Sequence, residues 1–163
     1  MESKPGYWQI GCGAHSRDYA DHFLRYGLAF AGGEAKVRVM EKVRAGDRML
    51  MKRGMTEVVA VGEVGERDGR YFGKDDKDWL RDFDGWDLRA YCFVEWHVPK
   101  KPIRAPGLTR GTIKSVRHAE LQKLAEKTLS TVPARDSVEP EPRPTRPIGD
   151  EELLEFLIRE GLR

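Results

Sequence analysis

Two tryptophans, Trp79 and Trp86, lie in an acidic, glycine-containing stretch just ahead of the most regular strand-like segment of the chain. An indole in a loop offers a flat face, and a nucleobase that stacks on an aromatic ring gains roughly 1 to 3 kcal/mol. Asp84 and Asp87, on either side of Trp86, offer carboxylates that accept hydrogen bonds from an exocyclic amine. The structural alternatives are that Trp86 closes one end of the core and that the carboxylates are solvated.

Basic side chains gather in two stretches, although the net charge of the 163 residues is only +2. Seven basic and two acidic residues lie in 36–53, and eight basic and two acidic residues lie in 100–127. In the second stretch, "TRGTIK" places Arg110, Thr112 and Lys114 around a glycine near the start of a predicted helix. Phosphates are commonly held in this way, and a plain helix cap is the alternative. The charge pattern is compatible with a phosphate-bearing partner, but taken alone it favours the alternative, a solvated surface.

The basic residues of the first stretch belong to segments that are predicted as strands. We therefore expect them at surface strand positions, where some of them would track a nucleic-acid backbone and about half would share one face. They are Lys36, Arg38, Lys42, Arg44, Lys52 and Arg53.

Four residues, Cys12, His15, Cys92 and His97, have spacings that suggest zinc, and Cys12 with His15 or His22 suggests a catalytic nucleophile. Because Cys92 and His97 are five residues apart in a predicted strand, they point to opposite faces. No catalytic signature surrounds Cys12. We therefore expect no metal, no cofactor and a non-catalytic chain, with an enzyme as the open alternative.

The cellular compartment is predicted from what the composition lacks. Two cysteines are too few for a disulfide scaffold and suit a reducing environment. No apolar run approaches the roughly 20 residues of a membrane span, and the first residues do not have the pattern of a signal peptide. We expect a cytoplasmic protein with no membrane partner.

Hydrophobic periodicity predicts the elements that position these residues. Strands are expected at 7–12, 36–43 and 88–98, and in two runs that contain 49–51 and 58–64 and are joined by a turn at Gly54. A long functional loop is expected at 67–85. In 88–98, strict alternation places Tyr91 and Phe93 on the face opposite to the apolar set that includes Trp96, and Trp8 and Trp96 are expected in the core.

Two helices are expected within the same domain. The first lies within 16–27, where Ser16 is the N-cap and Gly27 is the residue just past the C-terminal end of the helix. The second spans 112–129 and buries apolar side chains at helical spacing, namely Val116, Leu121, Leu124 and Leu129. Together these elements predict an α+β domain with a small, strongly curved mixed sheet.

The chain is expected to continue beyond this domain. Residues 1–130 form the domain, and 131–149 form a proline-rich linker with five prolines between 133 and 147. Residues 150–163 read as a short amphipathic helix that needs a partner for its apolar face. We interpret this helix as the start of a following domain that is truncated at Arg163.

Three segments, "YWQIGCG", "VRAGDRMLMKRG…EVVAVGEV" and "GWDLRAYCFVEWHVP", together with the helix between the first two, resemble the PUA-like superfamily. The resemblance covers residues 6–130 and is greatest to the EVE and YTH-like branch, with Gly46-Asp47 and "AVGEV" as its best local signature. It implies a PUA-like (EVE/YTH-like) curved mixed β-sheet pseudobarrel flanked by helices. In such domains an aromatic cage at the mouth of the barrel receives a flipped-out modified base, and basic residues on the rim take the phosphates.

The resemblance also implies site residues. The loop after the first strand, which would contact the base, contains Cys12, Gly13, His15 and Ser16 and lacks the Lys-Ser pair of YTH readers. One cage wall would be Tyr26 or Phe30, and another would be Trp79 or Trp86, with Asp84 beside them. The candidates for phosphate contacts are Arg110, Thr112, Lys114, Lys52 and Arg53.

The function expected on these grounds is that of a DNA-binding module of restriction and antiphage defence. It would recognise a methylated or hydroxymethylated base by base flipping and target a fused nuclease or motor domain. Two alternatives stay open. One is a modified-RNA-binding domain, and the other is a small hydrolase or ribonuclease of the ASCH type, with Lys52, Glu63 and Cys12 as its candidate residues.

Overall fold

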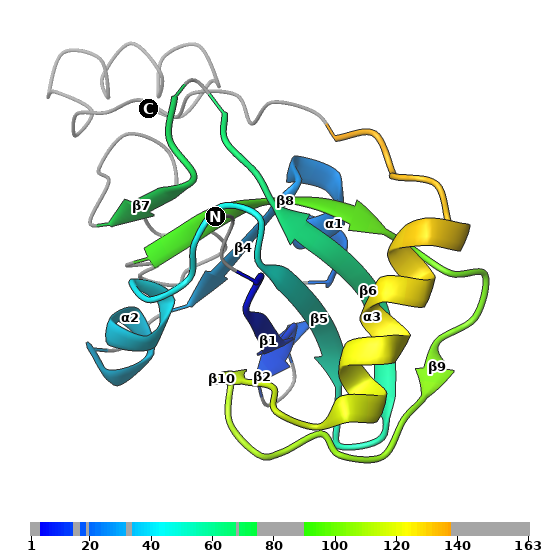
Figure 1. Ribbon diagram of the computed structural model, residues 1–163. Helices are drawn as coiled ribbons and strands as arrows, with labels where there is room; N and C mark the ends of the chain where they lie inside the picture. Colours follow the sequence, from blue (N-terminus) through cyan, green and yellow to red (C-terminus); the bar gives the residue numbers. More distant parts are fainter. Residues whose placement is uncertain are drawn as a thin grey trace, which may run out of the picture.

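A computed structural model of the chain describes residues 4–14, 17–18, 20–31, 34–67, 69–74 and 90–137 (Figure 1). The order of strands and helices has no repeating βαβ pattern. They are β1 (Tyr7–Gly11), β2 (Gly13–Ala14), β3 (Arg17–Asp18), α1 (Ala20–Tyr26), β4 (Leu28–Ala31), α2 (Glu34–Met40), β5 (Arg48–Arg53), β6 (Glu57–Val64), β7 (Phe72–Lys74), β8 (Ala90–His97), β9 (Ile103–Arg104), β10 (Ile113–Ser115) and α3 (Ala119–Thr131).

One mixed sheet organises the domain. Its strand order is β10-β1-β5-β6-β8-β4, with β7 also pairing with β8 and β9 with β6. Strands β1 and β5 are parallel, whereas the other pairs in this sheet are antiparallel. The sheet curls strongly into a half-barrel, and α3 lies alongside β5 and β6 (Figure 1). The predicted α+β class with a curved mixed sheet and flanking helices is confirmed.

Helix α2 spans the opening of the curled sheet. It contacts β4 and β10, which are the two ends of the strand order. The prediction of a strand over 36–43 was therefore wrong. The buried side chains of this segment, Val37, Met40 and Val43, are spaced by three residues, as on one face of a helix.

Two hydrophobic cores lie on opposite faces of the sheet. Successive side chains of β5 point to opposite faces of the sheet. Met49 and Met51 therefore lie in the larger core inside the half-barrel, whereas Leu50 lies in a smaller core that includes Leu121 of α3. Because both faces are covered, β5 and β6 read as nearly continuous apolar runs. In β8, Trp96 is 1% exposed and its indole N–H donates to the Leu28 carbonyl at 3.1 Å, which confirms its core assignment.

The predicted strand 88–98 is present as β8. Its two faces differ less in burial than the alternating pattern implies. Tyr91 and Phe93 are as buried as the apolar set, because β8 lies between β4 and β7 under neighbouring side chains. A Cβ built on Gly73 of β7 would lie 2.1 Å from the Tyr91 ring, so only glycine fits there. Residues 75–89 lie outside the described residues.

A buried carboxylate, Asp47, links the start of β1 to the start of β5 through hydrogen bonds. Asp47 is 7% exposed and accepts hydrogen bonds at 2.9 Å from the Gly6 N–H, the Trp8 indole N–H and the Arg44 N–H. Its own carbonyl accepts from Val64 N–H at 2.8 Å. Trp8, expected in the core, is only partly buried because its indole reaches this carboxylate. The Gly46-Asp47 signature thus has a structural role in joining β1, β5 and β6.

The segment predicted as one helix over 112–129 is two elements. Residues 113–115 form β10, which pairs with β1 and places Ile113 in the larger core, and α3 begins only at Ala119. Burial of Val116 and Leu121 agrees with the prediction, and Leu124 and Leu129 are partly buried. The first predicted helix is confirmed only over Ala20–Tyr26, which is α1, because Arg17–Asp18 form the short strand β3 instead. Gly27, with a φ of 63°, follows α1 as predicted. The proposed N-cap, Ser16, lies outside the described residues.

After α3 the chain turns back onto the sheet rather than leaving it at once. The His97 ring contacts the Val132 carbonyl through Nδ1, and Arg135 N–H donates to the Trp96 carbonyl at 2.7 Å. The rest of the predicted linker and the predicted helix 150–163 lie outside the described residues. In the part of the chain that the structure describes, no helix has both the length and the apolar character needed to cross a membrane.

Candidate nucleic-acid interface

Sheet topology brings three distant segments together at one end of the sheet. Because β1 and β5 are parallel, their C-terminal ends meet, with Gly11 opposite Lys52. Strand β10 begins beside them, and Gly11 N–H donates to the Thr112 carbonyl at 2.6 Å. We call this region the basic end and define it by residues 11–13, 52–53 and 109–114. It combines Cys12 and Gly13 of the predicted base-contacting loop with all five predicted phosphate-binding residues.

A buried glutamine holds the loop that closes the basic end. Gln9 is 1% exposed; its amide NH₂ donates to the Thr109 carbonyl at 2.7 Å, and its amide oxygen accepts from Thr109 N–H at 3.0 Å. The side chain thus pairs with a loop residue as a neighbouring strand would. Sequence analysis missed Gln9 because one polar residue inside a strand usually marks a solvated face.

Lys52 is buried, not at the surface as predicted. It lies on the same face of β5 as Leu50, and the chain between β9 and β10 covers this face through the buried Ala105 and Leu108. Lys52 is 7% exposed, and its ammonium group donates to the Thr109 carbonyl at 2.6 Å. Burial lowers the pKa of Lys52, and the positive charge of Lys114 lowers it further.

Lys114 shares that face of the sheet with Lys52. It pairs with Gln9 across β1 and β10, and Lys52 pairs with Gly11 two residues further along β1, so the two lysines lie on opposite sides of β1 with an offset of two residues. Gly111 has a φ of 110°, and a Cβ there would lie 2.8 Å from Lys114 Cε. The glycine therefore lets the stem of Lys114 pass close to the loop backbone.

The remaining phosphate candidates differ in exposure. Arg53 and Arg110 are exposed, and Thr112 is partly buried. The predicted helix N-terminus near Thr112 does not exist, because β10 occupies 113–115 and α3 starts at Ala119. Phosphate contacts at this end would therefore come from side chains and loop backbone, without a helix dipole.

The thiol of Cys12 points into the protein. Cys12 is 2% exposed, and its Sγ donates to the Lys52 carbonyl at 3.4 Å. Gly13 begins β2, which pairs with β3, whereas His15 and Ser16 lie outside the described residues.

The candidate residues of the hydrolase alternative are not close together. Glu63, on β6, pairs with Arg48 of β5, and Arg48 lies four residues, or roughly 13 Å, along β5 from Lys52. Cys12, Lys52 and Glu63 therefore do not form one catalytic cluster. Burial also raises the pKa of the other cysteine, Cys92, to about 12.

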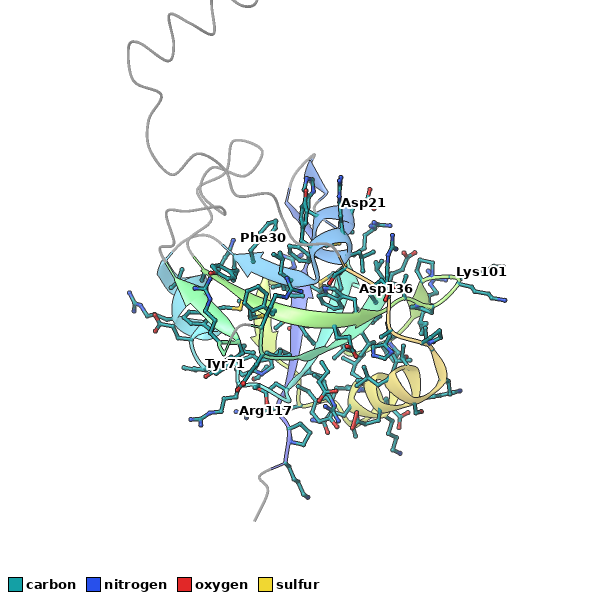
Figure 2. The ribbon with its side chains drawn as sticks, turned by 90° about the horizontal axis from the view of Figure 1, so that it is seen from above. Asp21, Phe30, Tyr71, Lys101, Arg117 and Asp136 are labelled. Atoms are coloured by element: carbon teal, nitrogen blue, oxygen red, sulfur yellow. The ribbon has the colours of Figure 1, made fainter. Side chains whose placement is uncertain are left out.

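Two of the four predicted cage aromatics are described. Phe30 is 5% exposed (Figure 2). Its ring packs edge-on against Phe23 with ring centroids 4.6 Å apart, a placement that favours a core role over an open cage wall. Tyr26 ends α1, is partly buried, and has the Arg25 guanidinium 5.4 Å from its ring centroid. The other two aromatics, Trp79 and Trp86, and the neighbouring Asp84 lie outside the described residues.

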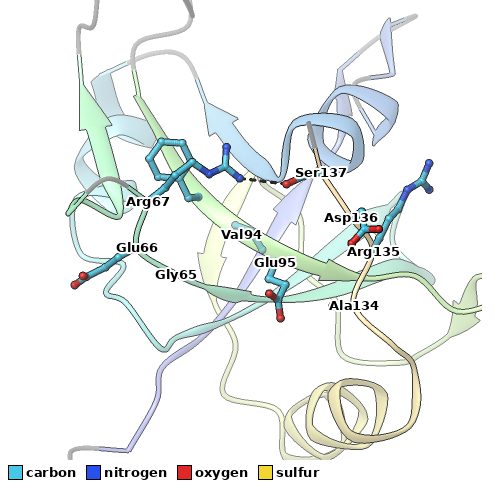
Figure 3. A pocket seen from close by; sticks show the side chains of 10 residues that line it. Gly65, Glu66, Arg67, Val94, Glu95, Ala134, Arg135, Asp136 and Ser137 are labelled. Carbon is cyan, nitrogen blue, oxygen red and sulfur yellow. Dashed lines mark hydrogen bonds between the residues drawn. The ribbon is translucent and has the colours of Figure 1, made fainter. Parts of the chain in front are cut away.

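A separate cavity of about 400 Å³ lies between the turn after β6, strand β8 and the segment 134–137 (Figure 3). Arg67 borders it, 4.5 Å from the centroid of the Phe93 ring, and donates to Ser137 Oγ at 3.4 Å and to the Tyr26 carbonyl at 3.2 Å. The lining carries both signs of charge, from Glu66, Glu95, Asp136, Arg67 and Arg135. Without a positive excess, this cavity is a poorer phosphate site than the basic end.

Comparisons of the chain with protein-family models, with curated proteins and with solved structures give no match. The fold and the site therefore define a class: an α+β protein with a curled mixed sheet that gathers basic side chains at one end.

Proposed function

We propose that this chain is a nucleic-acid-binding module of PUA-like fold that recognises a modified base, with DNA as the favoured polymer. The observation that carries the proposal is the convergence at the basic end. Residues 11–13, Lys52, Arg53 and the loop 109–114 were selected separately from the sequence for base and phosphate contacts, and they are neighbours across β1, β5 and β10.

Charge supports the phosphate part of the proposal. Arg53, Arg110 and Lys114 are exposed around the buried Lys52, and together they give one end of the sheet a local excess of positive charge. Phosphate contacts of this kind position a strand without reading its sequence. They account for affinity and for its dependence on salt.

Stacking supplies the base-reading part. Extruding a base from a duplex costs a few kcal/mol, and each aromatic face that receives it returns roughly 1 to 3 kcal/mol. Trp86 and Trp79 are the proposed stacking residues, with Tyr26 as a further wall at the end of α1. Discrimination would then depend on whether the cage fits a methyl or a hydroxymethyl group. A nuclease or motor domain fused after the linker would be the effector.

A binding titration tests this proposal. Matched DNA oligonucleotides with unmodified cytosine, 5-methylcytosine, 5-hydroxymethylcytosine or N6-methyladenine are compared with RNA strands of the same sequence, at two salt concentrations. We expect one modified probe to bind more tightly than its unmodified match, and affinity for every probe to fall with salt. Tighter binding of a modified RNA would shift the proposal to the RNA alternative.

The variant Trp86→Ala separates base reading from backbone binding. We expect it to lose the preference for the modified probe, a change of about tenfold, while it keeps most of its affinity for unmodified strands. An equal loss of affinity for every probe would contradict the cage assignment. Trp79→Ala, measured in parallel, shows whether a second wall contributes.

A further inference from the structure

The described part of the chain buries two charged side chains, Asp47 and Lys52, and each is 7% exposed. Asp47 accepts three N–H donors. Lys52 donates one hydrogen bond, to the Thr109 carbonyl, which already accepts from Gln9. Among the described residues, no carboxylate forms an ion pair with Lys52. Buried charges are normally paired, so the described part of the chain does not supply the negative charge that the burial of Lys52 calls for.

A second cation, Lys114, adds to the excess of positive charge around Lys52. Lys114 lies diagonally across β1 from Lys52, and its charge acts unfavourably on the Lys52 ammonium. Within the described residues, the groups recorded against Lys52 are neutral. Its ammonium contacts the Thr109 carbonyl, its stem lies beside Gly11 at the end of β1, and its backbone carbonyl accepts from the Cys12 thiol. Two like charges held on one face by a closed loop are stabilised when an anion lies between them.

We propose that Lys52 and Lys114 form a two-lysine site for one phosphodiester group of a bound strand, and that this site couples binding to proton uptake. The inference rests on the proposed function and adds to it the residues that hold one phosphate and the way pH controls them. A phosphodiester suits the site because it carries a single negative charge and oxygen acceptors for both ammonium groups.

Proton uptake follows from the environment of Lys52. In the free protein, burial and Lys114 lower the pKa of Lys52, so deprotonation begins at a lower pH than for a solvated lysine. A bound phosphate favours the charged form and raises that pKa again. Affinity is therefore greatest below the pKa of the free protein, and it falls as the pH rises through that value toward the pKa of the complex.

The first test measures the affinity for a fluorescent oligo(dA) strand between about pH 7 and about pH 9.5 at constant ionic strength. Neither adenine nor the phosphodiester titrates in this range, so a change reports on the protein. We expect wild-type affinity to fall with pH. Lys52→Met should bind about tenfold more weakly at the low end and lose most of the pH dependence. The proposal fails if Lys52→Met has the wild-type affinity or the wild-type pH profile.

Two further variants make this test specific. Lys114→Met removes an exposed cation and the like charge beside Lys52, so we expect weaker binding and a pH dependence that is shifted to higher pH. The control Lys127→Met makes the same change of net charge on an exposed position two turns along α3. It should keep the wild-type profile. If Lys127→Met weakens binding as much as Lys114→Met does, the effect belongs to net charge and the two-lysine site is refuted.

A second measurement distinguishes failure of the site from failure of the proposed function. Thermal unfolding is compared in sodium sulfate and in sodium chloride of equal ionic strength. Sulfate stabilises proteins in general, so the decisive quantity is the additional gain of wild type over Lys52→Met. We expect wild type to gain more. If no oligonucleotide binds at any pH, the proposed function is refuted, and equal sulfate gains in the two proteins would refute the anion site as well.

Discussion

Replacing Asp47 by asparagine should destabilise the domain by about 2 to 4 kcal/mol. One carboxylate oxygen, Oδ2, accepts from Trp8 and Arg44, and the other, Oδ1, accepts from Gly6. The amide oxygen of asparagine can replace only one of them, so its NH₂ group faces an N–H donor at the other. Hydrogen bonds to a charged group contribute about 1.5 to 3 kcal/mol each, and an unsatisfied buried donor costs about 1 to 3 kcal/mol. Loss of one bond, with two others weakened, gives the expected range.

Urea unfolding followed by tryptophan fluorescence measures this loss. The matched control is Glu63→Gln, because Glu63 is also a carboxylate beside β5 but is half exposed and pairs with Arg48 at 3.3 Å. A surface pair of this kind contributes at most about 1 kcal/mol. The dependence of unfolding free energy on urea should be the same in all three proteins. The reasoning is refuted if Asp47→Asn lowers the unfolding free energy no more than Glu63→Gln does.

Two glycine substitutions test close contacts. Gly73→Ala places a methyl group 2.1 Å from the Tyr91 ring and should lower the unfolding free energy by about 1 to 3 kcal/mol, whereas Gly65→Ala, with nothing within 4 Å, should be nearly neutral. Similar urea midpoints for the two variants would contradict the packing between β7 and β8. Gly111→Ala should weaken oligo(dA) binding by displacing Lys114, and Gly69→Ala carries a similar backbone strain without that contact. Equal oligo(dA) affinities of these two variants would show that the position of Lys114 does not matter.

Local pattern predicted the elements whose burial follows their own periodicity. Strand β8 was found from strict alternation, and α1 from helical spacing that ends at Gly27. Helix α2 was missed because Val37 and Val39 alternate as in a strand, and because the reason for a helix there is not local. It spans the opening between β4 and β10, whose relative positions depend on the whole sheet.

The candidate site was predicted in part for the same reason. Residue types indicated phosphate binding by Lys52 and Lys114, but burial of Lys52 depends on a loop more than 50 residues further along the chain. The role of Gln9 could not be predicted from the local sequence, because its partner Thr109 is 100 residues further along the chain. Conversely, Phe30 has a suitable residue type for a cage wall, yet its position on β4 places it against Phe23 in the core.

The two buried charges near the ends of β5 show how structural and functional roles divide in this fold. Asp47 and Lys52 are equally buried and are separated by roughly 17 Å along one strand. Three N–H donors satisfy the carboxylate, so the desolvation of Asp47 is offset within the domain itself. One neutral carbonyl, shared with Gln9, is the acceptor for the ammonium, and the positive charge of Lys114 acts unfavourably on it. Hydrogen bonds within the domain therefore account for the buried charge of Asp47, whereas the groups that the described residues place around Lys52 leave its charge without a negative partner, which a bound phosphodiester would supply.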